Sequence, residues 1–231
     1  MQICGKTVLI TGGAKRIGAA VARRLAGEGC RVIIHCRHSL PEAVRLIGEL
    51  PGEGHRAVCA DLAEEAEVRR LAREAGRFEL LVNSAALFFR PGSPEDAAAE
   101  AAGMYRRVNF EAPKLLLELF FAQNLPEAAA VNITDADAAD PPPSPSGYLQ
   151  SKIDLNALTV RLAPLWAKAN YRICAVAPAP MLPPPWAPDS RMSGVLKKSW
   201  FGRRVPTEDL TALISFIFRC DSLTGCVIPL R

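Results

Sequence analysis

The chain has 231 residues, of which 49% are hydrophobic and 23% are charged. A chain of this length and composition can bury a core without disulfide or metal support, which excludes the disordered and fibrous classes. The net charge of +4 comes from 28 basic and 24 acidic residues that are scattered along the chain, so it does not indicate nucleic acid as a partner.

Short apolar runs alternate with helical patterns through the first half of the chain. The runs are near-continuous and rich in Val, Ile and Leu, which is typical of strands buried on both faces. The expected strands are 6–11, 31–36, 56–60 and 80–82, and the expected helices are 17–28, 41–50 and 64–75. This order predicts a parallel sheet with helices on both of its faces.

The second half continues the alternation. A long helix is expected over 98–124, bent near Pro113, and another over 148–169, kinked at Pro164. The segment 178–188 carries six prolines, which excludes a helix or a central strand there. The remaining expected elements are strands at 128–134, 172–176 and 226–228, and a helix at 207–219. No repeat or low-complexity linker divides the chain, so we expect one domain spanning 1–231.

The sequence also limits the compartment. No apolar run reaches the roughly 18 residues of a bilayer-spanning helix, and the first six residues lack the pattern of a signal peptide. The seven cysteines contain no Cys-x-x-Cys pair, which favours buried reduced thiols over a disulfide framework or a metal site. We therefore expect a cytoplasmic protein with no metal and no membrane contact.

A glycine-rich turn, Thr11-Gly12-Gly13-Ala14-Lys15-Arg16-Ile17-Gly18, follows the first expected strand. Such a turn lets backbone N–H groups and a helix N-terminus face a pyrophosphate. Taken alone, it is also compatible with an ordinary strand–helix turn. Its position as the first turn of an alternating chain favours a nucleotide. The candidate residues are Thr11, Gly12, Lys15, Arg16, Ile17 and Gly18.

The end of the second expected strand, His35-Cys36-Arg37-His38-Ser39, lacks the acid that usually holds a ribose 2′-hydroxyl in NAD-binding proteins. Basic and hydroxyl side chains there suit a 2′-phosphate, although a solvated basic loop has the same composition. We expect NADP(H). The candidates are Lys15, Arg37, His38 and Ser39 for the 2′-phosphate, and Asp61 and Leu62 for the adenine edge. Without the nucleotide turn, Asp61 would be interpreted as a surface acid or a helix cap.

Tyr148 and Lys152 lie four residues apart at the start of an expected helix, so they share a face. An ammonium beside a phenol favours the phenolate and lowers the pKa of the tyrosine. The phenol then serves as a proton donor to a group that receives hydride. Such pairs are common on helix surfaces. The nucleotide turn upstream favours a catalytic role for this pair.

With these motifs, nearly the whole chain resembles the short-chain dehydrogenase/reductase family. The matching residues are Thr11, Gly12, Asp61, Asn83, Ser84, Ala85, Ala86, Asn109, Tyr148 and Lys152. The resemblance implies a single-domain Rossmann-type doubly wound fold with a seven-stranded, mostly parallel sheet, NAD(P)(H) binding, hydride transfer and a homotetramer or homodimer. It places Asn109 in the proton-relay group, and Asn83, Ser84, Ala85 and Pro178 at the cofactor.

Two departures from the family pattern resemble its pteridine reductase branch, which includes dihydromonapterin reductases. Arg16 replaces the middle glycine of the turn, and Asp135 replaces the serine usually found 13 residues before the catalytic tyrosine. Phe88 falls where those enzymes stack an aromatic ring on the pterin. Without the resemblance, Phe88 would be interpreted as a core residue, and Asp135 as a loop or cap acid.

The branch implies NADPH-dependent reduction of a dihydropterin or dihydrofolate to the tetrahydro form. Reducing a C=N bond requires a proton on nitrogen, and a carboxyl beside Tyr148 can share that proton; its pKa should rise close to a phenolate. Arg16 can reach over the pyrophosphate toward the ring. The expected substrate-binding residues are Arg16, Phe88, Asp135, Tyr148 and Met181, and the expected catalytic residues are Asp135, Tyr148, Lys152 and Asn109.

The segment 179–200 is expected to form a proline-rich substrate lid, with Met181, Leu182 and Trp186 at the pocket and Lys197 and Lys198 in solvent. Within it, Ala179 departs from the family's usual glycine after Pro178. Two alternatives stay open. One is a short-chain carbonyl reductase with another substrate, and the other is a non-catalytic NADP(H)-sensing protein.

Overall fold

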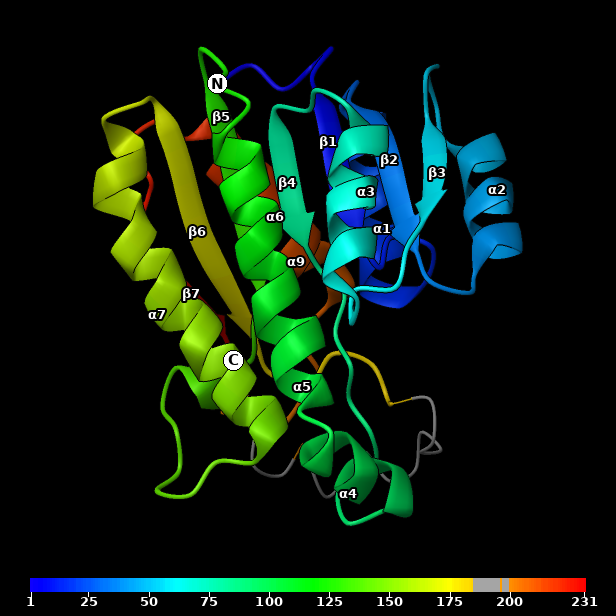
Figure 1. Cartoon of the computed structure of the whole chain (residues 1–231). Coiled ribbons are helices and arrows are strands. Elements are labelled where there is room, and N and C mark those ends of the chain that lie inside the picture. Colours follow the sequence, from blue (N-terminus) through cyan, green and yellow to red (C-terminus); the bar gives the residue numbers. More distant parts are fainter. Residues whose placement is uncertain (185–195, 197–199) are drawn as a thin grey trace.

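The computed structural model describes residues 1–184, 196 and 200–231. Trp186, Lys197, Lys198 and most of the expected lid lie outside the described residues. Seven parallel strands form one sheet in the order β3-β2-β1-β4-β5-β6-β7 (Figure 1). The strands are β1 (Thr7–Thr11), β2 (Arg31–Cys36), β3 (Arg56–Cys59), β4 (Leu80–Asn83), β5 (Ala128–Ile133), β6 (Tyr171–Pro178) and β7 (Val227–Leu230). The predicted Rossmann-type fold is confirmed, with a sheet that is parallel throughout.

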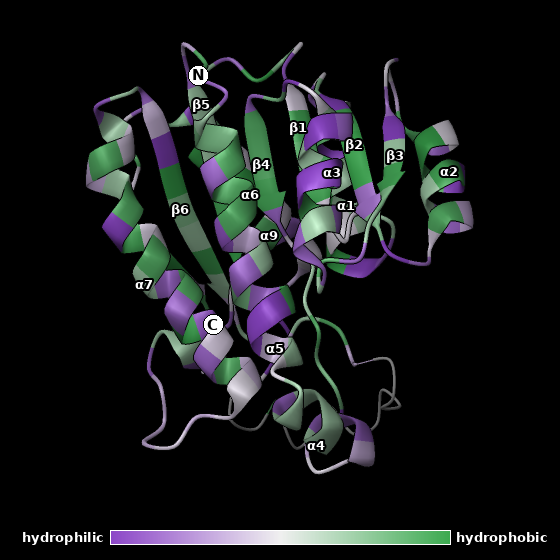
Figure 2. Ribbon diagram, in the orientation of Figure 1, coloured by the Kyte–Doolittle hydropathy of each residue, from purple (hydrophilic) through white to green (hydrophobic). Residues whose placement is uncertain are grey.

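Helices cover both faces of the sheet. One hydrophobic cluster packs α1 (Arg16–Gly27), α2 (Leu40–Glu49) and α9 (Thr207–Arg219) against one face. A second cluster packs α3 (Glu65–Ala75), α6 (Ala112–Phe121) and α7 (Gly147–Ala167) against the other. Figure 2 shows β1 and β4, at the centre of the sheet, largely in the hydrophobic colour. Burial on both faces explains why the strands are near-continuous apolar runs.

The helix expected over 98–124 is wrong as a single element. The region contains α4 (Pro94–Ala101), α5 (Met104–Arg106), a π-helical turn (Arg107–Glu111) and α6. Gly103 has a φ of +63°, a left-handed conformation that ends α4 and sets a new direction for α5. The π-helical turn absorbs an extra residue just before Pro113, so no sharp kink is needed there.

Helix α7 continues through Pro164, in agreement with the single helix expected over 148–169. Pro178 differs from the expectation. Strand β6 reaches Pro178, which pairs in register with Leu230, although we expected no central strand from that residue onward. Because Pro178 is the last residue of the strand, its missing N–H costs the sheet little.

The cysteines are free thiols, and their burial varies. Cys30, Cys36 and Cys174 are buried as expected, whereas Cys4 is exposed. In the part of the chain that the structure describes, no helix has both the length and the apolar character that crossing a membrane requires.

The turn between β1 and α1 is closed so tightly that it has no room for side chains at its glycines. A Cβ on Gly18 would lie 2.2 Å from the carbonyl oxygen of Gly12. Gly12 has a φ of +65°, and a Cβ there would lie 3.0 Å from the Cα of Ala85 in the loop after β4. The start of α1 therefore packs directly against the ends of the two central strands.

We expect Gly18→Ala to destabilise the protein, because the added methyl collides with backbone that must shift. The free energy of unfolding should fall by about 1–3 kcal/mol, the usual cost of overpacking. Gly27→Ala on the same helix is the matched control, since nothing lies within 4 Å of its Cβ position. That variant should gain up to about 1 kcal/mol. Urea unfolding measures both, and equal stabilities would contradict the close approach.

Candidate active site

A cavity of about 810 Å³ lies at the carboxyl ends of the central strands. Its walls come from the turn after β1, the ends of β2 and β3, the loop after β4, the end of β5, the start of α7 and the chain after β6. The strand order reverses between β1 and β4, and open parallel sheets bind ligands at such a point. The volume lies within the range of small-molecule sites.

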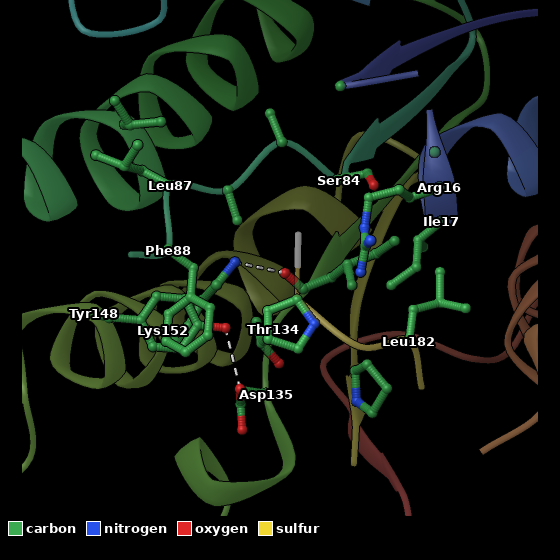
Figure 3. A pocket seen from close by; sticks show the side chains of 18 of the residues that line it. Arg16, Ile17, Ser84, Leu87, Phe88, Thr134, Asp135, Tyr148, Lys152 and Leu182 are labelled. Atoms are coloured by element: carbon green, nitrogen blue, oxygen red, sulfur yellow. Dashed lines mark hydrogen bonds between the residues drawn. The ribbon is translucent and has the colours of Figure 1, made fainter. Parts of the chain in front are cut away.

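Asp135 and Tyr148 are joined at the bottom of this cavity (Figure 3). Asp135 directly precedes a 3-10 turn (Ala136–Ala138) that follows β5, and Tyr148 is the second residue of α7. The tyrosine hydroxyl donates to Oδ2 of Asp135 at 3.1 Å. The backbone N–H of Asp137 donates to Oδ1 at 2.9 Å, so each carboxylate oxygen has a donor. The structure thus brings together the acid and the phenol that the sequence placed in one group.

Lys152 lies one turn further along α7, with its side chain buried. Its ammonium donates to the carbonyl oxygen of Ile133 at 3.0 Å and lies 5.9 Å from the centre of the Tyr148 ring. Burial lowers the pKa of Lys152 to about 8, because a charged group is poorly solvated there, while Asp135 opposes the shift. An ammonium has three donors, so two remain for a ligand.

The predicted lowering of the Tyr148 pKa by Lys152 is wrong for this arrangement. Burial and the Asp135 carboxylate raise the pKa of Tyr148 well above its ordinary value. The hydroxyl contacts the carboxylate directly, whereas the ammonium is bound to Ile133. The pKa of Asp135 is raised, as expected, but burial rather than a phenolate is the main cause. Both groups therefore hold their protons more firmly than in water.

Aromatic rings form one wall of the cavity. The ring of Phe88, 41% exposed, lies with its centre 4.6 Å from that of Tyr148. Tyr105 stands edge-on to Tyr148 at 6.2 Å between ring centres. Phe88 is thus a cavity residue and not a core residue.

Asn109 does not contact the predicted relay. Its side chain accepts from the N–H of Leu87 at 2.7 Å and donates to the carbonyl oxygen of Leu87 at 3.0 Å. It is fully buried in the π-helical turn and outside the cavity lining. Asn109 therefore positions the backbone of the loop that carries Phe88.

Two other predicted cofactor residues shape the cavity from below. Thr11 Oγ1 accepts from the N–H groups of Ser84 and Ala85 at 3.0 and 3.1 Å. Asn83 Nδ2 donates to Asn132 Oδ1 at 2.8 Å. Neither Thr11 nor Asn83 lines the cavity, whereas Ser84 and Ala85 do. These bonds fix the loop after β4 above the ends of two neighbouring strands.

The basic cluster predicted for a 2′-phosphate is only partly assembled. Lys15 and Arg37 line the cavity. Each is paired with an acid in the structure, Lys15 with Glu42 at 2.8 Å and Arg37 with Asp61 at 3.6 Å. His38 and Ser39 lie outside the lining, because the chain turns into α2 directly after them.

The other predicted residues of the phosphate turn, the adenine edge and the nicotinamide contact line the cavity, as does the substrate candidate Met181. They are Gly12, Ile17, Gly18, Asp61, Leu62, Pro178 and Met181. Arg16 also lines it, with a φ of +53° that glycine adopts more easily. Its guanidinium donates to the carbonyl oxygen of Pro183 at 2.7 Å instead of reaching over the turn toward the centre of the cavity.

His35 is one of several cavity residues that the sequence analysis missed. It is buried near the end of β2 and bonds through both ring nitrogens. The signal in the sequence was a lone polar residue in the apolar run Val32-Ile33-Ile34-His35-Cys36.

Comparisons with known proteins agree with this geometry. A family model described as short chain dehydrogenase matches residues 6–192. Oxidoreductase UcpA of Escherichia coli is 30% identical over 188 residues, covering 77% of this chain and 70% of the relative. L-xylulose reductase of Bos taurus is 26% identical over 239 residues, covering 99% and 96%. A solved short chain dehydrogenase from Burkholderia cenocepacia in complex with NADP gives a TM-score of 0.88 at 26% identity, covering 100% of this chain and 98% of that chain.

The buried ammonium of Lys152 predicts a pH-dependent stability. Its pKa is 10.5 in the unfolded chain and about 8 in the folded protein, so the unfolded chain binds more proton between these values. Its contribution to stability therefore rises with pH across this window. We expect wild type to gain up to about 3 kcal/mol relative to Lys152→Met from pH 8 to pH 10.5.

Urea unfolding at several pH values measures the difference. Lys168→Met, at the exposed end of the same helix, controls for the loss of a surface charge and should show no such slope. A constant difference between wild type and Lys152→Met over the window would contradict the buried ammonium.

Proposed function

The chain belongs to the short-chain dehydrogenase family, and on that basis we propose that it is an NADPH-dependent reductase of a pterin-type substrate. The reaction takes a dihydropterin or dihydrofolate to the tetrahydro form. The hydrogen bond from Tyr148 to Asp135 carries this proposal, because a carboxylate occupies the place of the hydroxyl donor that carbonyl reduction needs.

The donor set of the cavity fits NADP(H). The closeness of Gly18 to Gly12 leaves the N-terminus of α1 open to a pyrophosphate. Lys15 and Arg37 supply cationic donors for the 2′-phosphate. When the phosphate binds, it replaces the acids with which they are now paired. The NADP complex of the Burkholderia cenocepacia relative supports this choice. When bound, the cofactor supplies the hydride.

The chain's own residues supply the proton. The Tyr148 hydroxyl stays protonated because its pKa is raised, and it points at Asp135. The Asp135 carboxyl, whose pKa is also raised, holds a proton more readily than an exposed acid. In the transfer, the Tyr148 hydroxyl turns from Asp135 and gives its hydrogen to a ring nitrogen of the substrate, and the protonated Asp135 carboxyl returns a proton to the phenol oxygen. Lys152 offers its two remaining donors to the ribose and offsets negative charge on the pair.

The substrate half of the cavity suits a flat ring. Phe88 lines this half of the cavity, and stacking of a flat ring on an aromatic side chain is worth roughly 1 kcal/mol beyond the buried area. Met181, which is 5% exposed, adds an apolar side chain to the cavity lining. Arg16 would leave Pro183 to donate to the pterin or to a phosphate. These contacts complete the predicted substrate site.

A second candidate function is the reduction of a carbonyl substrate, favoured by the relative named L-xylulose reductase. A non-catalytic NADP(H) sensor has no use for the buried Asp135–Tyr148 pair, which counts against it. We further propose that 1–231 acts as one domain, in the cytoplasm, as a homotetramer or homodimer. Val160 and Leu165, 51% and 59% exposed on α7, support association.

We expect wild type to oxidise NADPH with dihydrobiopterin, dihydromonapterin or dihydrofolate, measured by NADPH absorbance. Asp135→Asn and Tyr148→Phe should each lower kcat by about 100-fold or more, because each removes a step of the proton relay. Asp135→Ser separates the two candidates: it harms a pterin reductase and improves a carbonyl reductase. Turnover of L-xylulose or another ketone with none of any pterin would establish the second candidate instead.

Arg37 should set the preference for NADPH over NADH. We expect Arg37→Ala to raise the Kd of NADPH about 10-fold to 100-fold, because a charge-assisted hydrogen bond to the 2′-phosphate is lost. The Kd of NADH should stay unchanged. His38→Ala is the matched control, since His38 lies outside the cavity lining. If His38→Ala raised the Kd of NADPH as much as Arg37→Ala, His38 would belong to the 2′-phosphate site, as the sequence predicted.

A further inference from the structure

His35 connects three strand ends beneath the nucleotide end of the cavity. The N–H of Gly12, after β1, lies 3.2 Å from its Nδ1. Its Nε2 lies 3.0 Å from the carbonyl oxygen of Ala60, after β3. A carbonyl only accepts, so Nε2 carries the hydrogen and Nδ1 is the acceptor for Gly12. The two partners therefore require neutral imidazole in a single tautomer.

The backbone of His35 holds the same turn. Its carbonyl oxygen accepts from the N–H of Gly13 at 3.0 Å. Both glycine N–H groups at the start of the turn are thus committed to this one residue, one to the ring and one to the main chain. Because Gly12 has a left-handed φ of +65°, its peptide orientation depends on such a partner.

We infer that His35 is a positioning residue for the nucleotide-binding turn and performs this role only as neutral imidazole. It orients the peptide of Gly12 from below, so that the later N–H groups and the N-terminus of α1 face the ligand. The inference rests on the nucleotide half of the proposed function and is independent of the pterin. The same ring bonds Ala60 and so holds the loop that carries Asp61. One side chain therefore positions both the phosphate turn and the predicted adenine contact.

Protonation would reverse the key contact. A hydrogen on Nδ1 would face the N–H of Gly12, and two donors repel each other. Burial lowers the pKa of His35 below its ordinary 6.5, which keeps the ring neutral near pH 7. As the pH is lowered below 6.5, the unfolded chain takes up a proton before the folded protein does, so the free energy of unfolding decreases. Nucleotide affinity falls as pH drops through the lower pKa of the folded protein.

The charged and titratable neighbours come from each strand end around the ring. Asp61, after β3, favours the protonated ring but is itself paired with Arg37 at the end of β2. Lys15 and Arg16, in the turn after β1, line the same cavity as His35. The thiols of Cys36 and Cys59 lie 3.6 Å apart beside it, and burial raises the pKa of Cys36 to about 12, so it stays uncharged.

The test compares variants that keep only one of the two hydrogen bonds of the His35 ring, the one with Gly12 or the one with Ala60. Asn at position 35 keeps an acceptor at the place of Nδ1 but does not reach Ala60. Gln reaches Ala60 but leaves the Gly12 N–H without an acceptor, and Phe keeps the shape of the ring with neither bond. We expect the Kd of NADPH, measured by fluorescence titration, to stay within about 3-fold for His35→Asn and to rise about 10-fold for His35→Gln and His35→Phe.

The pH profile supplies a readout that a purely structural role would not move. From about pH 8 to about pH 5, the wild-type affinity should fall more steeply than that of His35→Asn, whose side chain does not titrate. The titration of the phosphate of NADPH affects both proteins equally, so it does not contribute to the difference between their affinities. His55→Asn is the matched control, because His55 also bonds a backbone N–H, that of Val32, and a carbonyl oxygen, that of Pro51, away from the cavity.

Three results would overturn the inference. They are unchanged NADPH affinity in His35→Phe, tighter binding by His35→Gln than by His35→Asn, and equal pH profiles for wild type and His35→Asn. Thermal unfolding of each variant shows whether a loss is one of folding. A wild type that binds no NADPH overturns both this inference and the proposed cofactor, whereas intact NADPH binding without pterin turnover affects only the proposed substrate.

Discussion

The half-buried hydrogen bond from Tyr148 to Asp135 joins the end of the central strand β5 to the first turn of α7 at the wall of the cavity. Burial makes the charged form of each partner costly, which raises the pKa of both groups. The buried ammonium of Lys152 provides the opposite charge nearby and is itself easier to deprotonate. The chemistry of the cavity depends on this balance among three poorly solvated groups.

The parallel sheet makes such a site possible, because it brings the carboxyl ends of distant strands to one edge. A layer of buried polar side chains then fixes the loops. Asn83 bonds Asn132, which in turn donates to Thr159 on α7 at 2.9 Å. Asn109 fixes the backbone of Leu87 in the same way. These bonds specify geometry, which a purely apolar core does not, although the buried Oδ1 of Asn83 has no hydrogen-bond partner among the described residues.

Local pattern predicted most of the fold, because hydrophobic period and proline or glycine signals act over a few residues. The strand at 31–36 and the helix at 207–219 have the predicted bounds. The 98–124 region failed because a left-handed Gly103 and a π-helical turn leave no clear period. In the site, spacing predicted that Tyr148 and Lys152 share a helix face, and the resemblance to the family placed Asp135 beside Tyr148. It could not predict that Arg16 binds Pro183 or that His35 spans two loops, since these contacts depend on three-dimensional proximity.

The left-handed backbone of Arg16 has an evolutionary consequence. A non-glycine residue in this conformation costs a fold about 1–2 kcal/mol, and glycine at the same position would remove that cost. Arginine and glycine codons can differ by one base. A single mutation therefore separates a chain with a guanidinium at the mouth of its cavity from a more stable one with an open mouth, and selection on the ligand decides which of the two a lineage keeps.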